Sequence, residues 1–397
     1  MAVFSGSLAR AAVFLGAIPV LAWAQPANLK ILLTGQSMIR SDLRASAPSA
    51  VPVIASLLKG GDVVFTNFEG TVAEPGQPNQ EAPIQGRGFI APPTALEALR
   101  ALGFNLLALS NNHAFDLRIP GIQNTLRAAN RLELAHAGIG NTIAEAAAPG
   151  YLRTAKGTIA LVAMASGLIP PGASATAAQA GVDELHVEAG NKPNEEDAKR
   201  ILQSIREASK KADLVIVYQH NHVFDKPFST IFEEGMPERL RPPDWIQQWT
   251  HREIDAGADL IVMHGAPLLH GIEIYKGRPI FYDLGNFIYN LPLPVWYIQE
   301  PLAWESVVAS VEMQGGRLQS IKLQPIEMNV LGQGQPEMDP HANNLFLQTR
   351  GLPRPAAGEK AGYILNRIAE YSRPFGTVID VEGATGEIDV RTETHKH

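Results

Sequence analysis

The sequence predicts an α/β sandwich, and two observations carry this prediction. From residue 29 to about residue 290, short apolar runs alternate with amphipathic stretches of helical period, the pattern of strands and helices packed in layers. Several of the apolar runs end in side chains that can bind metals, and open α/β folds place their chemistry at such strand ends. The chain has 397 residues, of which 45% are apolar and 18% charged, enough for one large domain or two ordinary ones.

The first residues predict a signal peptide over residues 1–24. Arg10 is their only charge, an apolar run covers residues 11–21, and the tripeptide ending at Ala24 fits a small-x-small cleavage site. The apolar run is well short of the roughly 20 residues that a spanning helix needs, which favours cleavage over anchoring. We therefore expect a periplasmic or secreted protein that associates with a membrane only if this segment stays uncleaved.

The elements of the sandwich follow in order. Strands are expected where short apolar runs stand between turn residues, and helices where apolar residues recur three or four positions apart. The last two helices before residue 260 carry dense charge on one face, as solvent-exposed helices do. The expected strands are residues 30–33, 63–67, 106–109, 159–163, 214–218, 260–263 and 279–282, and the expected helices are residues 51–58, 94–102, 119–129, 195–211 and 243–256.

Two segments interrupt this alternation. Residues 74–88 are rich in Pro, Gly and Gln, and residues 168–190 contain Pro170, Pro171 and many small residues. We expect both to be long surface loops, and such loops often close over sites.

After Pro301 the sequence becomes rich in strands. Apolar alternation predicts strands at 306–313 and 318–325, a helix at 360–371 and a hairpin over 378–390 that turns near Gly383. We expect a core over residues 25–300, with residues 301–397 as a C-terminal extension packed on the same domain.

Charge and cysteine content exclude some functions. The formal charge is −7, and cleavage that removes Arg10 makes it −8, so a dominant attraction to nucleic acid is not expected. The chain has no cysteine, which excludes disulfides, Cys nucleophiles and thiolate metal sites. A bound metal must therefore use His, Asn, Gln, Asp or Glu, ligands that suit manganese, zinc or iron.

Side chains able to bind metals cluster at the ends of five expected strands. Taken singly, an Asn at a strand end most often caps a helix, and a lone His is most often a hydrogen-bonded filler. Their recurrence at successive strand ends is hard to explain by packing alone. These candidates are Gln36, Glu69, Asn111, Asn112, His113, His220, His222, His264 and His270.

The ordered set resembles the bacterial CapA family, the capsule or poly-γ-glutamate synthesis proteins, over roughly residues 29–289. Residues 67–70 stand at the family's Asn-x-Glu motif, residues 111–113 at its Asn-Asn-His motif, His220 at its His-Trp-Gly motif, and residues 282–287 close the match. The resemblance implies a calcineurin-like metallophosphoesterase fold. This fold is a metallophosphatase-like αββα sandwich of two mixed sheets with flanking helices.

The resemblance also implies roles for the site residues. One or two divalent ions (Mn, Zn or Fe) would activate water and polarise the substrate oxygen. Glu69 would be a bridging carboxylate, and His113 the general acid. Asp116 would either orient the His113 imidazole or cap the following helix. Asn112, His220 and His264 would be neutral ligands, Gln36 and His222 weaker ones, and Asn111, Asn286 and His270 substrate contacts, although His270 fits a solvated turn slightly better.

Three departures from the family pattern lower the ligand count. Gln36 stands where the family has a metal-binding Asp, and a neutral amide oxygen is a weaker ligand. Gly265 and Pro267 stand where the family usually has a His-Pro-His pair. His222 replaces the Gly of the His-Trp-Gly motif.

The leading hypothesis is an exported metal-dependent hydrolase of an amide, isopeptide or phosphoester bond, and the resemblance points to a capsular or poly-γ-glutamate polymer. The alternative is a non-catalytic assembly or export factor that binds such an acidic polymer in the same cleft. A nucleotidase or general phosphatase follows only by analogy with the fold.

Overall fold

A computed structural model describes residues 28–74, 88–226, 242–290, 301–334 and 344–388, together with Met1 and Val390. Apart from Met1, the predicted signal peptide lies outside the described residues, as does the predicted loop at 74–88 except for its two end residues. Within these ranges, none of the helices has the length and apolar character needed to cross a membrane.

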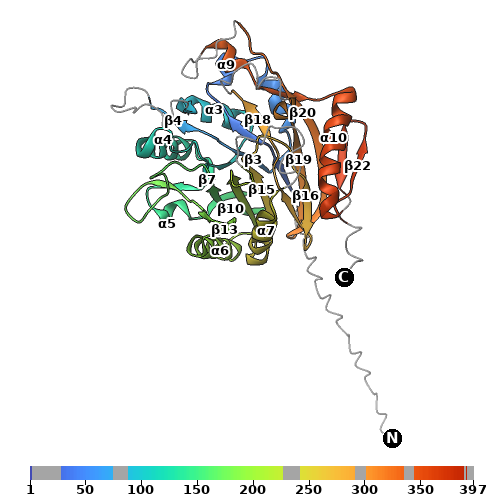
Figure 1. Ribbon diagram of the computed structural model, residues 1–397. Helices are drawn as coiled ribbons and strands as arrows, with labels where there is room; N and C mark the ends of the chain where they lie inside the picture. The colour runs from blue at the N-terminus through green and yellow to red at the C-terminus, as the bar shows by residue number, and fades with distance from the viewer. Residues whose placement is uncertain are drawn as a thin grey trace.

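Two mixed sheets lie face to face and carry helices on their outer sides (Figure 1), which confirms the predicted αββα sandwich. In the first sheet the order is β22 (Ile379–Glu382), β23 (Thr385–Ile388), β20 (Arg317–Met328), β19 (Glu305–Gln314), β1 (Asn28–Leu33), β3 (Val63–Asn67), β6 (Leu106–Ala108) and β7 (Ala135–Ala137), with β21 (Pro353–Pro355) beside β20. In the second the order is β16 (Ile272–Tyr275), β17 (Arg278–Phe281), β15 (Leu260–His264), β14 (Leu214–Asn221), β10 (Gly157–Ser166) and β9 (Gly150–Thr154).

Shorter elements complete the described chain. Four small strand pairs are β8 (Ile139–Gly140) with β11 (Gly181–Val182), β12 (Val187–Glu188) with β13 (Lys192–Pro193), β18 (Asn286–Tyr289) with β2 (Gln36–Met38), and β4 (Thr71–Val72) with β5 (Ile90–Ala91). The helices are α1 (Leu43–Ser46), α2 (Val51–Leu57), α3 (Pro93–Leu102), α4 (Arg118–Arg131), α5 (Ile143–Ala146), α6 (Glu195–Ser209), α7 (Asp244–Ala256), η4 (Pro301–Trp304), α9 (Leu345–Thr349), α10 (Gly358–Ser372) and η5 (Arg373–Phe375).

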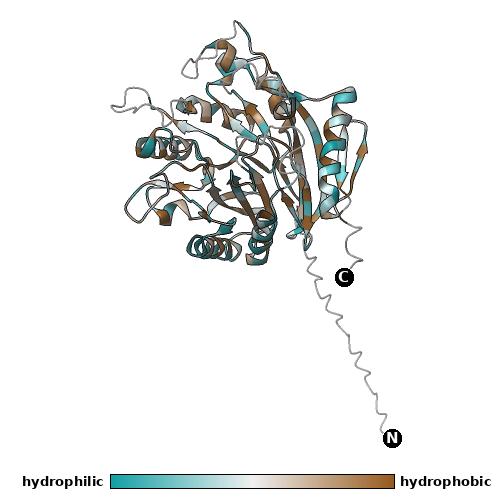
Figure 2. Cartoon of the chain, in the orientation of Figure 1, coloured by the Kyte–Doolittle hydropathy of each residue, from teal (hydrophilic) through white to brown (hydrophobic). Residues whose placement is uncertain are grey.

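Alternation along the strands builds three apolar layers. On β1, Ile31 and Leu33 point toward the second sheet, whereas Leu32 joins the cluster under α2 and α3. On β14, Ile216 faces the first sheet and Val217 packs under α6 and α7. Because both faces of these strands are covered, each strand carries a continuous apolar run, residues 31–33 on β1 and 214–218 on β14, and the strands inside the sandwich are largely brown in Figure 2.

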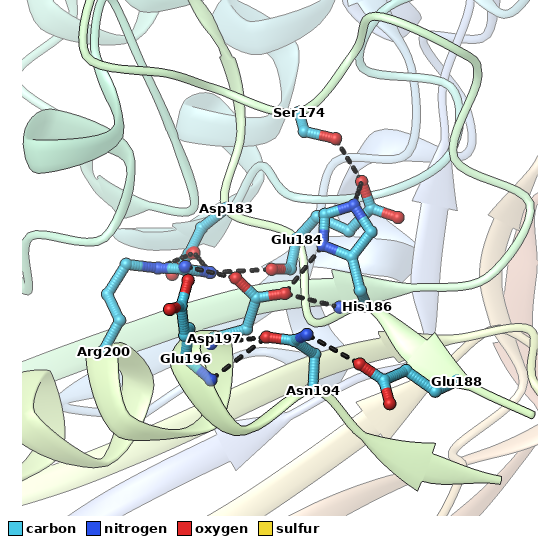
Figure 3. A network of polar contacts seen from close by, with 9 residues as sticks. All are labelled: Ser174, Asp183, Glu184, His186, Glu188, Asn194, Glu196, Asp197 and Arg200. Atoms are coloured by element: carbon cyan, nitrogen blue, oxygen red, sulfur yellow. Dashed lines mark hydrogen bonds and ion pairs between the residues drawn. The ribbon is translucent and has the colours of Figure 1, made fainter.

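The segment after β10 is only in part the predicted surface loop: residues 176–178 and 188–190 are exposed. Residues 180–183 are buried, and Gly181 approaches Ala173 so closely that a Cβ there would lie 2.2 Å from the Ala173 carbonyl oxygen. Arg200 on α6 donates to Asp183 Oδ1 from Nε at 3.0 Å and from Nη2 at 2.8 Å. Figure 3 shows this network, which attaches the segment to the start of α6.

The C-terminal strands are part of the first sheet. β19 pairs antiparallel with β1 from Asn28↔Gln314 to Leu33↔Ala309, so it separates β1 from β20. α10 packs Ile364 and Ile368 into the core between the sheets. The terminal hairpin of β22 and β23 turns at Gly383, at the predicted position.

Candidate active site

The candidate site lies where the carboxyl ends of both sheets meet. β1, β3 and β6 run parallel to one another, as do β14 and β15. The turn after β1 passes close to the backbone of Gly285. Gly35 permits this approach because a Cβ there would lie 2.5 Å from the Gly285 carbonyl oxygen. His220 and His264 are direct neighbours in the register of β14 and β15.

Glu69 is a buried carboxylate at the end of β3. Its Oε1 lies 3.9 Å from His220 Nε2, and its Oε2 has no hydrogen-bond partner among the described residues. Burial raises the pKa of Glu69 to about 7, against a lowering effect of His113. A nearby cation would restore the charged carboxylate.

His220 is the centre of a group of short contacts. Its Nε2 lies 2.9 Å from Asn112 Oδ1 and 2.9 Å from His222 Nε2, and its Nδ1 lies 3.1 Å from the Tyr218 hydroxyl. Burial, aided by repulsion from the neighbouring imidazoles, lowers the pKa of His220 well below its usual range, and burial lowers the pKa of His222 to about 3. Burial therefore favours the neutral form of both rings.

His264 and Gln36 each keep one buried acceptor without a donor. His264 Nε2 donates to the Thr34 carbonyl at 3.1 Å, which leaves the Nδ1 lone pair unused in the described structure. Asn286 Nδ2 donates to the Ala303 carbonyl, so its Oδ1 accepts from Gln36 Nε2 at 3.0 Å. Gln36 Oε1 is then left without a hydrogen-bond partner in the same part of the chain.

His113 and Asp116 form an acid–base pair at the opening. His113 Nδ1 lies 2.8 Å from Asp116 Oδ2, and 22% of the His113 side chain is exposed. Burial acts to lower the pKa of His113, but the charge and hydrogen bond of Asp116 outweigh it and the pKa is raised. Asp116 also accepts from the Phe89 amide at 2.7 Å, whereas the N-cap of α4 is Leu117, with no side-chain cap. Asp116 therefore orients the imidazole and does not cap the helix.

Two predicted substrate contacts support loops instead. Asn111 is fully buried. It donates to the Phe68 carbonyl at 2.8 Å and accepts from the His113 amide at 3.0 Å. Asn286 is also fully buried, in the bonds to Gln36 and Ala303 described above. Both placements argue against direct contact with a substrate.

His270 is not the solvated turn residue that its sequence context favours. It is 3% exposed, and it lines a cavity of about 10 Å³ with Asn221, His264 and Asp283. Its Nε2 has no hydrogen-bond partner within the described ranges.

Tyr218 is a site residue that the sequence reasoning missed. A signal was present, because residues two apart on a strand share a face, and Tyr218 precedes His220 by two.

The donor chemistry fits a divalent ion if amide oxygens take part. Buried acceptors without donors are costly, and Glu69, Gln36 and His264 each keep one. Over the described ranges, no group of three or more His, Asp and Glu side chains is placed to hold an ion. Gln36 and Asn112 would have to complete the set, a mixture of nitrogen and oxygen ligands that suits Zn, Mn or Fe.

Comparison with known proteins gives one family match. Residues 30–291 match the family model described as bacterial capsule synthesis protein PGA_cap. The uncharacterized protein y4sH of Sinorhizobium fredii is 28% identical over 426 residues, covering 84% of this chain and 87% of that protein. The PGA biosynthesis protein CapA of Bacillus subtilis is 26% identical over 260 residues, covering 65% of this chain and 61% of that protein. A solved phosphatase of Mycoplasma pneumoniae aligns with a TM-score of 0.44 at 11% identity, covering 75% of this chain and 93% of that structure.

Proposed function

The chain belongs to the family of the bacterial capsule synthesis protein PGA_cap, and from this premise we propose an exported, metal-dependent hydrolase. Its substrate is an amide, isopeptide or phosphoester bond in a capsular or poly-γ-glutamate polymer. One observation carries the proposal. The pair of His113 and Asp116 lies at the same strand ends as the buried group of Glu69, Asn112 and His220. A surface used only for adhesion has no evident use for that combination.

Each residue has a role in this proposal. Glu69, Asn112, His220, His264 and Gln36 hold one or two divalent ions. The ion supplies Lewis acidity and activated water when bound.

His113 supplies the proton of the reaction. His113 Nδ1 lies 2.8 Å from Asp116 Oδ2 and donates its proton to that oxygen. Nε2 is therefore the nitrogen that gives a proton to the leaving group. The imidazolium form is stabilised by the same carboxylate.

Metal content and turnover test the proposal in one experiment. We would purify the mature protein, residues 25–397, beside a His220→Ala/His264→Ala double variant and His113→Gln. His251→Ala is the control, because His251 contacts Tyr275 and Glu273 outside the site. We expect near-stoichiometric metal in the parent, His113→Gln and the control, and loss of metal in the double variant.

Hydrolysis is then measured on γ-glutamyl amides and phosphoesters. We expect His113→Gln to lower kcat by about 10²–10⁴ while it keeps its metal. A parent that binds no manganese, zinc or iron contradicts metal dependence.

A non-catalytic polymer-binding factor is the second candidate. Two observations favour it: Gln36 engages Asn286 with its amide, and Gly265 cannot carry a ligand because a Cβ there would lie 2.0 Å from the Asn221 carbonyl oxygen. Both reduce the number of charged or strong ligands. Saturable binding of labelled poly-γ-glutamate, with no cleavage by metal-loaded protein, would support this candidate over the hydrolase.

A further inference from the structure

We propose that Phe89 is a positioning residue for His113, and that its ring and its backbone amide together hold the imidazole in the orientation that proton transfer needs. The inference rests on the proposed role of His113 as general acid. It adds to the site a residue that lies outside the motifs of the sequence.

The ring of Phe89 lies against the imidazole of His113. The two ring centroids are 4.4 Å apart, and the ring planes make an angle of 71°. This edge-to-face arrangement is a favourable geometry for a pair of aromatic rings. Because 22% of the His113 side chain is exposed, the contact supports a ring that stands partly in the opening of the site.

The backbone of Phe89 holds the partner of the imidazole. The Phe89 amide donates to Asp116 Oδ2 at 2.7 Å, and the same oxygen accepts from His113 Nδ1 at 2.8 Å. One residue therefore contacts both members of the acid–base pair, the carboxylate through its amide and the imidazole through its ring.

These contacts hold His113 at three places. Its amide donates to Asn111 Oδ1 at 3.0 Å, its Nδ1 is held by Asp116, and its ring is held by Phe89. The hydrogen bond at Nδ1 alone leaves the imidazole able to turn about the line that joins the two bonded atoms. The Phe89 ring opposes this rotation, so Nε2 keeps one direction. Direction matters because a misplacement of about 1 Å can cost about 10²-fold in rate.

The core of the protein holds Phe89 itself. Its side chain is 7% exposed and packs in an apolar cluster with Met38 of β2, Tyr289 of β18 and Trp304 of η4. Its carbonyl accepts from the Thr71 amide at 2.9 Å, beside the pairing of β4 with β5. Phe89 therefore ties an imidazole at the opening to the packed interior.

The chain next to Glu69 approaches the same residue. A Cβ on Gly70 would lie 2.9 Å from the Phe89 carbonyl oxygen, so a glycine permits this close approach. Gly70 immediately follows Glu69 in the sequence. Phe89 thus contacts both the strand end that carries the buried carboxylate and the loop that carries the general acid.

NMR of the histidine rings tests the inference without any need for turnover. The mature protein, labelled with ¹⁵N in its histidines, is compared with Phe89→Leu, and the His113 signals are identified by their absence in His113→Gln. We expect the His113 ring signals of Phe89→Leu to shift and to broaden, because leucine keeps apolar volume but leaves the imidazole able to turn. Phe89→Tyr keeps the ring and should resemble the parent.

Phe115→Leu is the matched control. Phe115 is 5% exposed and lies two residues after His113, but its side chain packs in the cluster under α2 and α3. Each variant is checked for folding by its melting curve. Unchanged His113 signals in Phe89→Leu, or an equal change in Phe115→Leu, would overturn the inference.

Hydrolysis kinetics give the second readout. On a substrate that the parent cleaves, we expect Phe89→Leu to lower kcat by about 10- to 100-fold and to leave KM unchanged, because residue 89 holds the proton donor and not the substrate. Phe89→Tyr and Phe115→Leu should keep the kcat of the parent. An unchanged kcat in Phe89→Leu contradicts the positioning role. A parent that cleaves none of the substrates contradicts the proposed function, while the NMR comparison still decides whether Phe89 holds the His113 ring.

Discussion

Several buried side chains in the described structure have a nitrogen or oxygen atom with no hydrogen-bond partner. Leaving one buried acceptor unpaired costs about 1–3 kcal/mol, so native proteins keep few of them. Glu69, Gln36 and His264 keep theirs at the meeting point of the sheets. Glu253, on α7, is also fully buried, and neither of its carboxylate oxygens makes a hydrogen bond of normal geometry within the described residues.

Glu253 predicts a specific dependence of stability on pH. Burial raises its pKa from 4.5 to about 8, although Trp249 and Arg252 act in the opposite direction. Between these two values the folded protein keeps a proton that the unfolded chain releases, so stability falls as pH rises through this window. Glu253→Gln stays neutral, and we expect its free energy of unfolding to exceed that of the parent by on the order of 2 kcal/mol at pH 8.

Urea unfolding at pH 5 and pH 8 checks this expectation. The advantage of Glu253→Gln should shrink at pH 5, where the parent carboxyl group is also protonated in the folded state. Glu359→Gln, at an exposed position of α10, is the control. An advantage of equal size at both pH values would contradict the prediction.

Elements differ in how far local sequence predicts them. The long strands of both sheets were predictable, because apolar runs between turn residues leave few alternatives. The pairing of β18 with β2 was not, because it joins residues about 250 positions apart and has no local pattern. The segment at 168–190 is exposed over much of its length, as predicted, but residues 180–183 are buried. The prediction missed this part because small residues allow close backbone packing, as Gly181 against Ala173 shows.

The ion pair that holds this segment to α6 predicts a double-mutant result. Asp183 is fully buried and accepts two bonds from Arg200, and burial raises its pKa to about 6. Arg200→Met leaves the carboxylate buried without its partner, and we expect a loss of about 3–5 kcal/mol in the free energy of unfolding. Asp183→Asn/Arg200→Met should lose less, because a neutral amide costs less to bury. Equal losses in the single and double variants, measured by urea unfolding, would refute this account.

The whole molecule is a single sandwich closed by its C-terminal strands. The family match confirms the resemblance seen in the motifs, and it ends at residue 291, before β19 begins. The structure nevertheless places β19 beside β1, near the middle of the first sheet. The boundary of the matched sequence is therefore not a boundary of the packed core.

Truncation after residue 300 tests this point. β1 would lose its pairing with β19 along its full length, and the apolar face of β1 would lose its neighbours Val307 and Val311. We expect the shortened chain to lack a cooperative thermal unfolding transition. A chain that lacks only residues 391–397 should melt like the parent. Cooperative melting of the 1–300 chain would contradict the prediction.

The site as a whole was predictable in outline from the sequence. Parallel strand ends share one edge, so side chains such as Glu69 and His220 were expected to meet, and they lie 3.9 Å apart. The sequence did not predict which atoms of these side chains stay free of hydrogen bonds to the protein. The hydrogen bonds of the Asn111 side chain to the backbone and the burial of His270 depend on how the loops pack. No short motif encodes that packing.

Gly265 couples the ends of two neighbouring strands. A Cβ at position 265 would lie 2.0 Å from the Asn221 carbonyl oxygen, so any side chain there requires the end of β14 to move as well as the end of β15. A substitution at this single position therefore acts on both strands at once, and the absence of an atom at residue 265 helps to fix where His220 and His264 stand.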